Sequence, residues 1–297
     1  MKSFKLIHAT FVALLLCSSF ISCHHDIETT VAANADSVAF MSAARHELKV
    51  RAAKESYTIS ARIFNSPQTI SVIRFSPKHF AVLPIMSPTA TEVSKTATLH
   101  DADIAINACS WNIEQDRAIT LIKIDGEVLS TTLSSMLPRV NGLLYIYDDH
   151  IEINQSEAIP DYPGLIEDCD NVMACGPVLM DDGHKVSYKH ITETDHPAAS
   201  FYLTRHPRTV IGHTAEGDVY FIVVDGRSAG NADGMSIEEL TQLCSWLEMT
   251  EAMNLDGGGS STLWCRERGV INHPCDNKKF DHEGERKVLS AILAKRK

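Results

Sequence analysis

Short runs of strand-like sequence separated by tight turns recur along most of this chain, and they are what most restricts its fold. The turn Asp125-Gly126 separates the runs 120–124 and 128–129, and Asp-Gly favours the primed turns that join antiparallel strands. Parallel strands would need crossover connections of about a dozen residues or more. Two further pairs of runs have the same short separation, namely 143–147 with 151–153 and 209–213 with 219–224. The pattern predicts an α+β fold that is mainly antiparallel sheet with few helices packed on it.

One helix is clear from its first turn and its spacing. Ser236 and Glu239 form a capping box, in which each side chain closes a free backbone amide at the start of a helix. Leu240, Leu243 and Leu247 then recur at helical spacing and predict a buried stripe. The helix lies between two acidic segments of the chain, Asp225-Gly226-Arg227 before it and the segment that contains Asp256 after it. A strand–loop–helix–strand connection would therefore bring both segments to one edge of the sheet.

The first residues have the pattern of an export signal. Lys2 and Lys5 precede the apolar run 11–16, which is too short to span a membrane. The sequence then reaches Cys23 in an arrangement that resembles a bacterial lipoprotein signal, in which the cysteine becomes the acylated first residue. We expect a signal peptide over 1–22, lipidation at Cys23 and a protein held by its lipid in the cell envelope, facing the periplasm or the cell surface. A secreted protein without the lipid is the alternative.

The segment between this signal and the main domain divides into two parts. Residues 23–40 are polar and without pattern, which predicts a flexible tether. Residues 41–100 show the alternation of strands, and we interpret them as an N-terminal strand and helix segment that extends or flanks the main sheet. Within this segment, Pro84 and Pro88 are expected to interrupt the strand pattern. The expected elements are strands at 47–50, 57–63 and 69–75 and a short helix at 89–99. The main domain is predicted for 101–297.

The charge balance excludes one class of partner. The 297-residue chain has a formal net charge of -11, and its basic residues cluster only at 295–297. Nucleic-acid-binding proteins present a basic face to the phosphate backbone, so we expect no nucleic-acid partner. With 44% hydrophobic and 22% charged residues, the composition is that of an ordinary globular protein with an ample core.

Six cysteines follow the predicted signal and its final cysteine, and an exported chain could oxidise them in pairs. The local pairs Cys265 with Cys275 and Cys169 with Cys175 are the first candidates. Buried free thiols are an equal alternative, because the chain is large enough to fold without cross-links.

The segment 254–262, Asn-Leu-Asp-Gly-Gly-Gly-Ser-Ser-Thr, is the most unusual stretch of the chain. Three consecutive glycines are costly to order, and a chain keeps them where something must approach bare backbone or where φ must be positive. The amides of residues 257–261 could then line an anion pocket, with Asp256 and Asn254 presented at a strand end. The alternative interpretation is a tight loop between two strands.

From Ala102 onward the chain contains short motifs in a fixed order. The motifs are residues 106–107, 176–179, 208–212, 224–227, 234–236, 254–262, 272–274 and 285–286. In this order and number they resemble the phosphodiester glycosidase family, whereas the glycine run alone would be unspecific. One departure follows Asn107. Family members usually carry Asn-Gly-Gly-Phe, and this chain has Asn-Ala-Cys-Ser-Trp over 107–111, which bears on the identity of the substrate.

The resemblance implies hydrolysis of a sugar that is joined through its anomeric oxygen to a phosphodiester. A phosphomonoester leaving group needs little protonation, because its second pKa is about 6, but its charge has to be neutralised. Arg208, Arg227 and Arg286 are candidates to hold the phosphate by bidentate bonds. An oxocarbenium-like transition state needs a carboxylate beneath it, either as nucleophile or as base for water. The candidate carboxylates are Asp225, Asp256 and, third, Glu285, with their individual roles left open.

The remaining predicted site residues come from the same motifs. Contacts to the substrate or its phosphate are expected from Asn107, Gly176, Thr209, Asn254, Gly257, Gly258, Gly259, Ser260, Ser261 and Asn272. The expected substrate is a small sugar phosphate or an envelope glycan. No cofactor and no metal are predicted, although a divalent cation is allowed. A zinc site can be drawn from Cys265, His273, Cys275 and His282, but this spacing matches no common structural pattern.

Other interpretations of the same residues remain open. An Asp-Gly-Arg after a strand is most often a turn, and His206, His213 and His273 are more often structural than catalytic. A serine hydrolase motif and a dinucleotide fingerprint both need a glycine where Thr262 stands, and the glycine run lacks the lysine of a phosphate-binding P-loop. The functional alternative is a non-catalytic module that binds envelope glycan or peptidoglycan with the same pocket.

Overall fold

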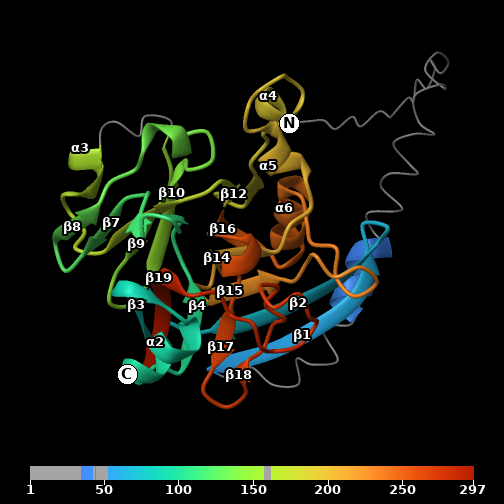
Figure 1. The fold of residues 1–297 in the computed structure, drawn as a ribbon, viewed down its shortest axis with the longest axis horizontal. Coiled ribbons are helices and arrows are strands. Elements are labelled where there is room, and N and C mark those ends of the chain that lie inside the picture. The colour runs from blue at the N-terminus through green and yellow to red at the C-terminus, as the bar shows by residue number, and fades with distance from the viewer. Residues whose placement is uncertain (1–34, 43, 45–52, 157–161) are drawn as a thin grey trace, which may run out of the picture.

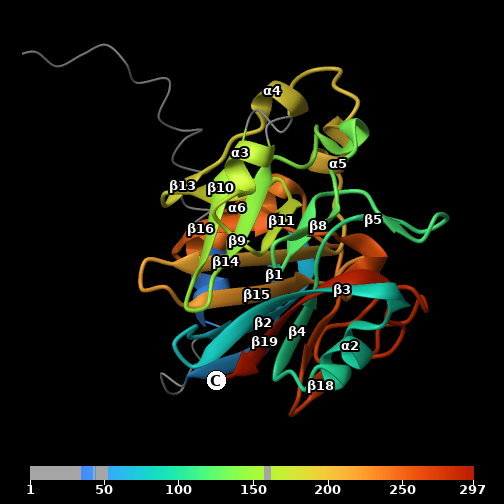
Figure 2. The same ribbon diagram turned by 90° about the vertical axis from the view of Figure 1, so that its left-hand side faces the viewer.

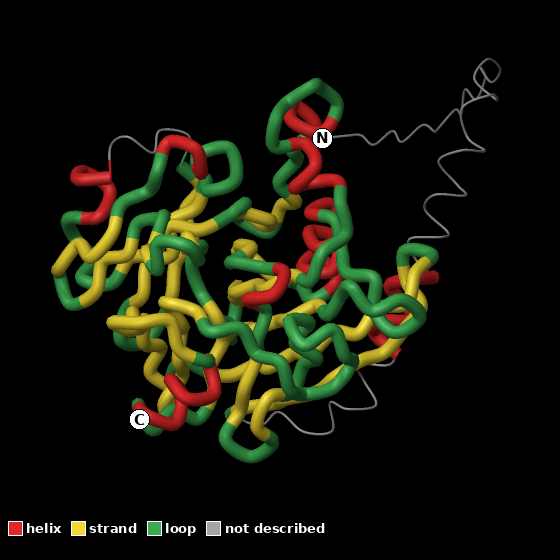
Figure 3. The backbone as a smooth tube through the Cα atoms, viewed as in Figure 1, coloured by secondary structure: helices red, strands yellow, loops and turns green. Residues whose placement is uncertain are grey.

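The computed structural model describes residues 35–42, 44, 53–156 and 162–297. Across these ranges strands and loops dominate and the helices are short, as Figure 3 shows. The described strands form four sheets in which neighbouring strands pair antiparallel. The predicted α+β class, mainly antiparallel sheet with few helices, is confirmed.

A seven-stranded sheet runs through the centre of the molecule in the order β1-β2-β15-β14-β16-β12-β13 (Figure 1). Its strands are β1 (Lys54–Ile63), β2 (Ser66–Phe75), β12 (Val178–Asp181), β13 (His184–Lys185), β14 (Arg208–Thr214), β15 (Val219–Val224) and β16 (Met249–Asn254). Successive residues of a strand point to opposite faces. Val219 and Phe221 of β15 accordingly lie in one core, and Tyr220 and Ile222 lie in another. Because both faces are covered, β15 is buried throughout.

Two five-stranded sheets flank the central one, in the orders β10-β9-β11-β7-β8 and β18-β17-β4-β19-β3. The first contains β7 (Ile122–Ile124), β8 (Glu127–Ser130), β9 (Gly142–Ile146), β10 (Ile151–Gln155) and β11 (Val172–Cys175). The second contains β3 (Phe80–Thr91), β4 (Ile104–Asn107), β17 (Leu263–Cys265), β18 (Gly269–Val270) and β19 (Val288–Arg296). A separate pair is formed by β5 (Trp111–Asn112) and β6 (Arg117–Ala118). The three predicted hairpins are present as β7–β8, β9–β10 and β14–β15.

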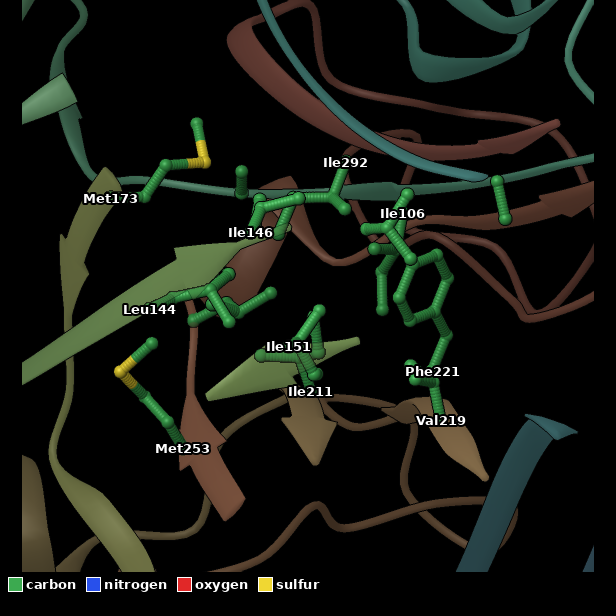
Figure 4. Close-up of a cluster of buried hydrophobic side chains, with 14 of the residues drawn as sticks. Ile106, Leu144, Ile146, Ile151, Met173, Ile211, Val219, Phe221, Met253 and Ile292 are labelled. Atoms are coloured by element: carbon green, nitrogen blue, oxygen red, sulfur yellow. The ribbon is translucent and has the colours of Figure 1, made fainter. Parts of the chain in front are cut away.

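The largest core lies where the three large sheets meet (Figure 4). Leu144 and Ile151 come from one flanking sheet, Ile292 from the other, and Ile211 and Phe221 from the central sheet. Each of these residues is at most 3% exposed. Burial of one such side chain contributes about 1.5–3 kcal/mol. This cluster fixes the sheets relative to one another, and it thereby fixes the strand ends from which the polar loops leave.

The longest described helix, α6 (Ile237–Trp246), packs on β12 and β16. Ser236 accepts a hydrogen bond from Glu239 N at 3.2 Å, and Ser236 N donates to the Glu239 carboxylate at 2.9 Å, so the predicted capping box is confirmed. Shorter helices are α2 (Val93–Leu99), α3 (Tyr162–Ile166), α4 (Lys189–Thr192) and α5 (Ala199–Leu203), and residues 35–42 are helical as well. The view in Figure 2 shows α2 beside the sheet that contains β3, β4 and β19.

The strands before residue 100 belong to the same sheets as the rest of the chain. β2 pairs with β15, and β3 pairs with β19. The expected interruption at Pro84 and Pro88 is wrong, because β3 runs through both prolines. β3 is the edge strand of its sheet, and a proline there costs no ladder hydrogen bond when its missing amide would face outward. The helix expected at 89–99 begins at Val93, after this strand.

Several N-terminal predictions fall outside the described residues: the signal peptide at 1–22, the lipidated Cys23 and the strand at 47–50. Of the tether predicted for 23–40, the described part is helical, and Phe40 is fully buried with its ring 5.9 Å from that of Trp246. The tether prediction is therefore wrong for this part, because an aromatic anchor holds it to the domain. No helix in the described part of the chain is long and apolar enough to cross a membrane.

Candidate active site

Two acidic loops leave the central sheet at the same edge. β14 lies between β15 and β16, and it pairs with β15 through Val224 and with β16 through Asn254 (Figure 1). Because β15 and β16 both run antiparallel to β14, they end at one edge, about 10 Å apart across the intervening strand. The loops that follow carry Asp225 and Asp256. The structure thus brings together the two acidic loops that were expected to meet.

Asp225 is buried and fully hydrogen-bonded. Its Oδ1 accepts from the backbone N–H of His273 at 2.9 Å and from Asn272 Nδ2 at 3.2 Å, while Oδ2 lies 2.8 Å from His273 Nδ1. Burial raises the pKa of this carboxyl, and the hydrogen bonds from His273 oppose that rise. Only 1% of the residue is exposed, so Asp225 is placed to orient the imidazole of His273.

The His273 ring is held by further aromatic contacts. Phe280 stacks on it with ring centroids 3.8 Å apart, and His282 lies 4.4 Å away. When Nδ1 donates to Asp225, Nε2 is the ring nitrogen left for another partner. Sequence reasoning selected Asn272 in this loop, whereas its neighbour His273 was considered more often structural than catalytic. An adjacent Asn-His pair carries no local signal that separates the two roles, because the contact to Asp225 is made across the fold.

Asp256 has a different environment. The residue as a whole is half-buried, and Ser110 Oγ donates to Oδ1 at 3.2 Å. Its backbone is fixed on both sides, because its N–H donates to Ala108 O at 2.8 Å and its carbonyl accepts from Asn107 Nδ2 at 2.6 Å. Burial raises the pKa of this carboxyl above its usual range, and the hydroxyls of Ser260 and Ser110 and the charge of Arg286 oppose the rise. The backbone is held firmly while the carboxylate keeps free acceptor positions.

A small cavity of about 80 Å³ opens beside Asp256. Asn254 lines it and donates through Nδ2 to Gly176 O at 2.9 Å and to Leu255 O at 2.7 Å. These bonds leave Asn254 Oδ1 buried without a hydrogen-bond partner in the described part of the chain. Buried polar atoms are nearly always paired, so this acceptor suits a hydroxyl group of a ligand.

Arg139 also lines this cavity, and no sequence motif pointed to it. Its side chain is exposed, with the guanidinium carbon 5.1 Å from the centre of the Phe201 ring. Gly176 allows Arg139 to come close, because a Cβ at that glycine would lie 2.7 Å from Arg139 O. A cation that lines the same cavity as Asp256 thus comes from a segment far away in the sequence.

The glycine run makes room for two further arginines. A Cβ on Gly258 would lie 3.0 Å from Arg227 Nη2, and a Cβ on Gly259 would overlap the guanidinium of Arg286. Asp276 holds Arg286 through two bonds of 2.8 Å each. Arg227 has a φ of 61°, in the left-handed region that non-glycine residues rarely adopt. The glycines therefore bring two cations against bare backbone directly after the pocket carboxylate.

The predicted anion pocket of backbone amides is smaller than expected. Gly258 N donates to Pro207 O, Ser260 N to Gly257 O and Ser261 N to Gly258 O. The last two bonds belong to the tight turn η3 (Gly258–Ser260), which uses its own amides. Ser260 is also 1% exposed. The glycine run mainly allows arginine side chains to approach the backbone closely, and donation from its amides to an anion is secondary.

Two predicted site residues have structural partners instead. Arg208 is 1% exposed, and its guanidinium donates to three backbone carbonyl oxygens at 2.8 to 3.0 Å. Burial lowers its pKa to about 10. Glu285 accepts from Ser94 N at 3.0 Å and from Ser94 Oγ at 2.5 Å, so it closes the first turn of α2. Because these structural partners occupy both side chains, Arg208 and Glu285 hold the fold together and have no part in the proposed reaction.

Buried polar residues from four motifs form the frame between the loops. Asn107 Oδ1 accepts from Thr262 N and from the Thr209 hydroxyl, both at 3.0 Å. Thr209 Oγ1 also lies 3.1 Å from Ser261 Oγ, and Asn272 Nδ2 donates to Ser261 O at 3.1 Å. These five residues are at most 2% exposed. Four of them, all except Thr262, were expected to contact the substrate. Their hydrogen bonds are instead to one another and to the loops, so these residues set the shape of the site from behind it.

Neither predicted cysteine pair is joined in the structure. The six described cysteines are free thiols, and the sulfur that lies beside Cys175 belongs to Cys109, at 3.1 Å. Cys275 Sγ contacts Gly258 O at 3.7 Å, beside the glycine run. Within the described ranges, no three or more His, Cys, Asp or Glu side chains are grouped so that they could hold a metal ion.

Known proteins resemble this chain in sequence. Residues 100–295 match the family model described as phosphodiester glycosidase. The mouse N-acetylglucosamine-1-phosphodiester alpha-N-acetylglucosaminidase is 22% identical over 173 residues, which cover 58% of this chain and 26% of the mouse protein. The chain therefore spans about a quarter of the length of that curated relative.

Solved structures share the fold. The zebrafish N-acetylglucosamine-1-phosphodiester alpha-N-acetylglucosaminidase catalytic domain, auto-inhibited by its pro-peptide, has a TM-score of 0.65 at 18% identity, over 84% of this chain and 86% of that one. A hypothetical protein from Synechocystis has a TM-score of 0.61 at 16% identity, over 82% and 62% of the two chains. A putative exported protein from Burkholderia pseudomallei has 0.55 at 14%, over 77% and 74%. At these identities the likeness shows the fold alone. The match of the family model to residues 100–295 carries the assignment, and the chain belongs to the phosphodiester glycosidase family.

Proposed function

We propose that this chain hydrolyses a glycosyl phosphodiester and releases the sugar from its link to phosphate. The observation that carries the proposal is the position of Arg227 and Arg286 against Gly258 and Gly259, directly after Asp256. A carboxylate with guanidinium groups near it, beside a cavity, suits a sugar whose leaving group is an anion. Membership of the family supports the same class of reaction.

The arginines would serve the leaving group. A phosphomonoester has a second pKa of about 6, so its departure at neutral pH needs charge neutralisation more than a proton. Arg227 and Arg286 would supply charge-assisted hydrogen bonds to the phosphate oxygens. The paired bonds from Asp276 already fix the Arg286 guanidinium, which reduces the entropy lost when it binds an anion. Arg139 borders the same cavity and would add a third cation.

Asp256 would face the anomeric carbon of the sugar. It would act either as a nucleophile that forms a glycosyl intermediate or as a base that activates water. Both roles need the ionised carboxylate, which the hydrogen bond from Ser110 and the charge of Arg286 favour. The raised pKa makes the ionised group a stronger base than an exposed aspartate. Asn254 Oδ1, the buried acceptor without a partner, would receive a sugar hydroxyl.

Asp225 and His273 would act as one unit. The Asp225 carboxylate holds the Nδ1 proton of His273, so that Nε2 is free to exchange a proton with water or with the departing oxygen. Orientation of an imidazole by a buried acid is a general way to select one tautomer. In this proposal Asp225 is a positioning residue, and His273 carries the proton.

We also propose export and lipid attachment at Cys23, on the basis of the sequence pattern at residues 1–23. Cys23→Ser should then move the protein from the membrane fraction to the soluble fraction of producing cells. Equal membrane retention of the variant would count against the lipid anchor, and it would leave the proposed reaction untouched.

The reaction is tested with a panel of sugar-1-phosphodiesters, from small sugar phosphates to envelope glycans, assayed with and without a chelator. The wild-type protein should release free sugar, and Asp256→Asn should not. In isotopically labelled water the label should enter the sugar, because the bond between the anomeric carbon and oxygen breaks. Label in the phosphate would overturn this mechanism. Tight binding of a substrate analogue by a wild-type protein that turns nothing over would support a glycan- or peptidoglycan-binding module instead.

A further inference from the structure

Two cysteines from different sheets meet at the wall of the cavity. Cys109 follows β4, Cys175 ends β11, and their sulfur atoms lie 3.1 Å apart. Cys109 is 2% exposed and Cys175 is 3% exposed. The Cys109 backbone is fixed as well, because its N–H donates to Ser290 Oγ of β19 at 2.9 Å. Two thiols that are held this close within a rigid core are placed for a covalent bond.

We propose that Cys109 and Cys175 are joined by a disulfide in the mature protein, and that this cross-link holds one wall of the cavity in place beside Asp256. In the oxidation each thiol loses its proton and the two sulfurs form one bond. The two electrons reduce the disulfide of a thiol–disulfide oxidoreductase to a dithiol. The remaining approach, from 3.1 Å to a bond length of about 2 Å, is small enough for side-chain rotation to supply.

The cross-link would act on the strip of chain that touches the pocket carboxylate. Asp256 N donates to Ala108 O at 2.8 Å, one residue before Cys109. Ser110 Oγ, one residue after it, donates to the Asp256 carboxylate at 3.2 Å. Cys175 itself lines the cavity. A bond between the two sulfurs therefore ties the segment 108–110 to the end of β11. It thereby also fixes Ser110, whose hydroxyl donates to the Asp256 carboxylate.

The surroundings fit a structural bond rather than a reversible switch. The adjoining Cys109 thiol and burial together raise the pKa of Cys175 well above its usual value. Exchange with another disulfide needs a thiolate, so the folded dithiol would react slowly. The bond would then form while the chain folds and would resist reduction afterwards. It would close a loop between residues 66 positions apart, which restricts the unfolded chain. This inference rests on the proposed export to an oxidising compartment and is independent of the reaction proposed above.

Peptide mapping tests the bond directly. The full chain is produced in an oxidising compartment, its free thiols are alkylated in denaturant, and it is digested without reduction. We expect the peptides that contain Cys109 and Cys175 to be recovered as one linked species. Recovery of both residues as alkylated thiols would overturn the proposal, whatever the protein's activity. Linkage of either residue to a different cysteine would do so too.

The consequence for the fold is tested with two variants. Wild-type protein that is unfolded, reduced and refolded with its thiols kept reduced should melt roughly 5 °C or more below the oxidised form. Cys109→Ala should lose this dependence on redox state, whatever its own Tm. Cys244→Ala, which alters a fully buried cysteine in α6, should retain it. Equal Tm values for oxidised and reduced wild-type protein would contradict a stabilising cross-link.

Discussion

The loop that carries Asp225 and the loop that carries Asp256 leave the same sheet edge, yet the surroundings of the two carboxylates differ. Asp225 is 1% exposed and both its carboxylate oxygens have hydrogen-bond partners, two of them from His273. Asp256 is half-buried, accepts from Ser110 and lines a cavity. The strand ends bring the acids together, but the donors around each acid decide its role: one orients an imidazole, and the other is left open to a ligand.

The largest expected effect comes from removing the charge in the cavity. Asp256→Asn should lower kcat by about a thousandfold or more, because this carboxylate is proposed to meet the reacting carbon. The circular dichroism spectrum should match the wild type, since the backbone bonds of residue 256 remain. If the variant keeps more than a tenth of wild-type kcat, Asp256 does not take part in the reaction, and the proposed difference in role between the two loops is wrong.

A smaller effect is expected on the other side of the comparison. Asp225→Asn and His273→Gln should each lower kcat by about a hundredfold, and the double variant should be no slower than the worse single one, because the two residues act as a unit. Multiplied losses would show that they act separately. Glu251→Gln is the matched control: it alters another carboxylate–histidine pair, Glu251 with His213 at 2.9 Å, and should leave kcat unchanged.

How far the sequence predicts this protein depends on how local the determining contacts are. The Asp125-Gly126 turn and the capping box at Ser236 depend on neighbours within a few residues, and both were predicted correctly. The continuation of β3 through Pro84 could not be predicted, because the edge position of that strand is set by pairing with β19. Tertiary pairing overrides the local signal in such cases.

The same limit applies to the site. The glycine run indicates that something approaches the backbone, but it does not say that the approaching groups are Arg227 and Arg286. Arg139 gave no signal, because it enters the cavity from a loop more than a hundred residues before Asp256. The motifs predicted the acidic loops and the arginines near them. The different roles of these residues could be assigned only from the fold.

The arginines test whether the Asp256 loop binds an anion. Arg227→Met and Arg286→Met should each raise KM by roughly tenfold, because each removes a charged donor worth about 1.5–3 kcal/mol. Inhibition by inorganic phosphate should weaken in parallel. Arg266→Met, which alters an exposed arginine paired with Asp101, should change neither value. Unchanged KM and unchanged phosphate inhibition in both site variants would contradict the phosphate-binding role of this loop.

The smallest effect concerns stability and sharpens the contrast in environment. Burial raises the pKa of Asp256 in the folded protein, so the folded state keeps that proton to higher pH than the unfolded chain does. Above the unfolded pKa of about 3.9 the ionised acid therefore costs stability, and this cost is absent below it. Asp256→Asn should melt roughly 2–4 °C above the wild type at pH 7 and level with it near pH 3.5.

Asp225→Asn should behave differently, although burial raises its pKa as well. The substitution replaces a carboxylate that the backbone N–H and the ring Nδ1 of His273 both contact, so one hydrogen bond is lost in a buried place. We expect its Tm to fall below that of the wild type at pH 7. Thermal unfolding of both variants at the two pH values decides the matter, and a shift of the same sign in both would show that the two acids have equivalent surroundings.

β19 enters its sheet between β3 and β4, although it follows every other described strand along the chain. Its Ala291 is the partner of Asn107, the residue whose amide holds the backbone of Asp256. Pairing across such a long stretch of chain is intrinsically slow. The candidate pocket would stay unformed until residues 288–296 had been synthesised and had docked. Activity would then appear in one step at the end of folding, with no partly active nascent chain before it.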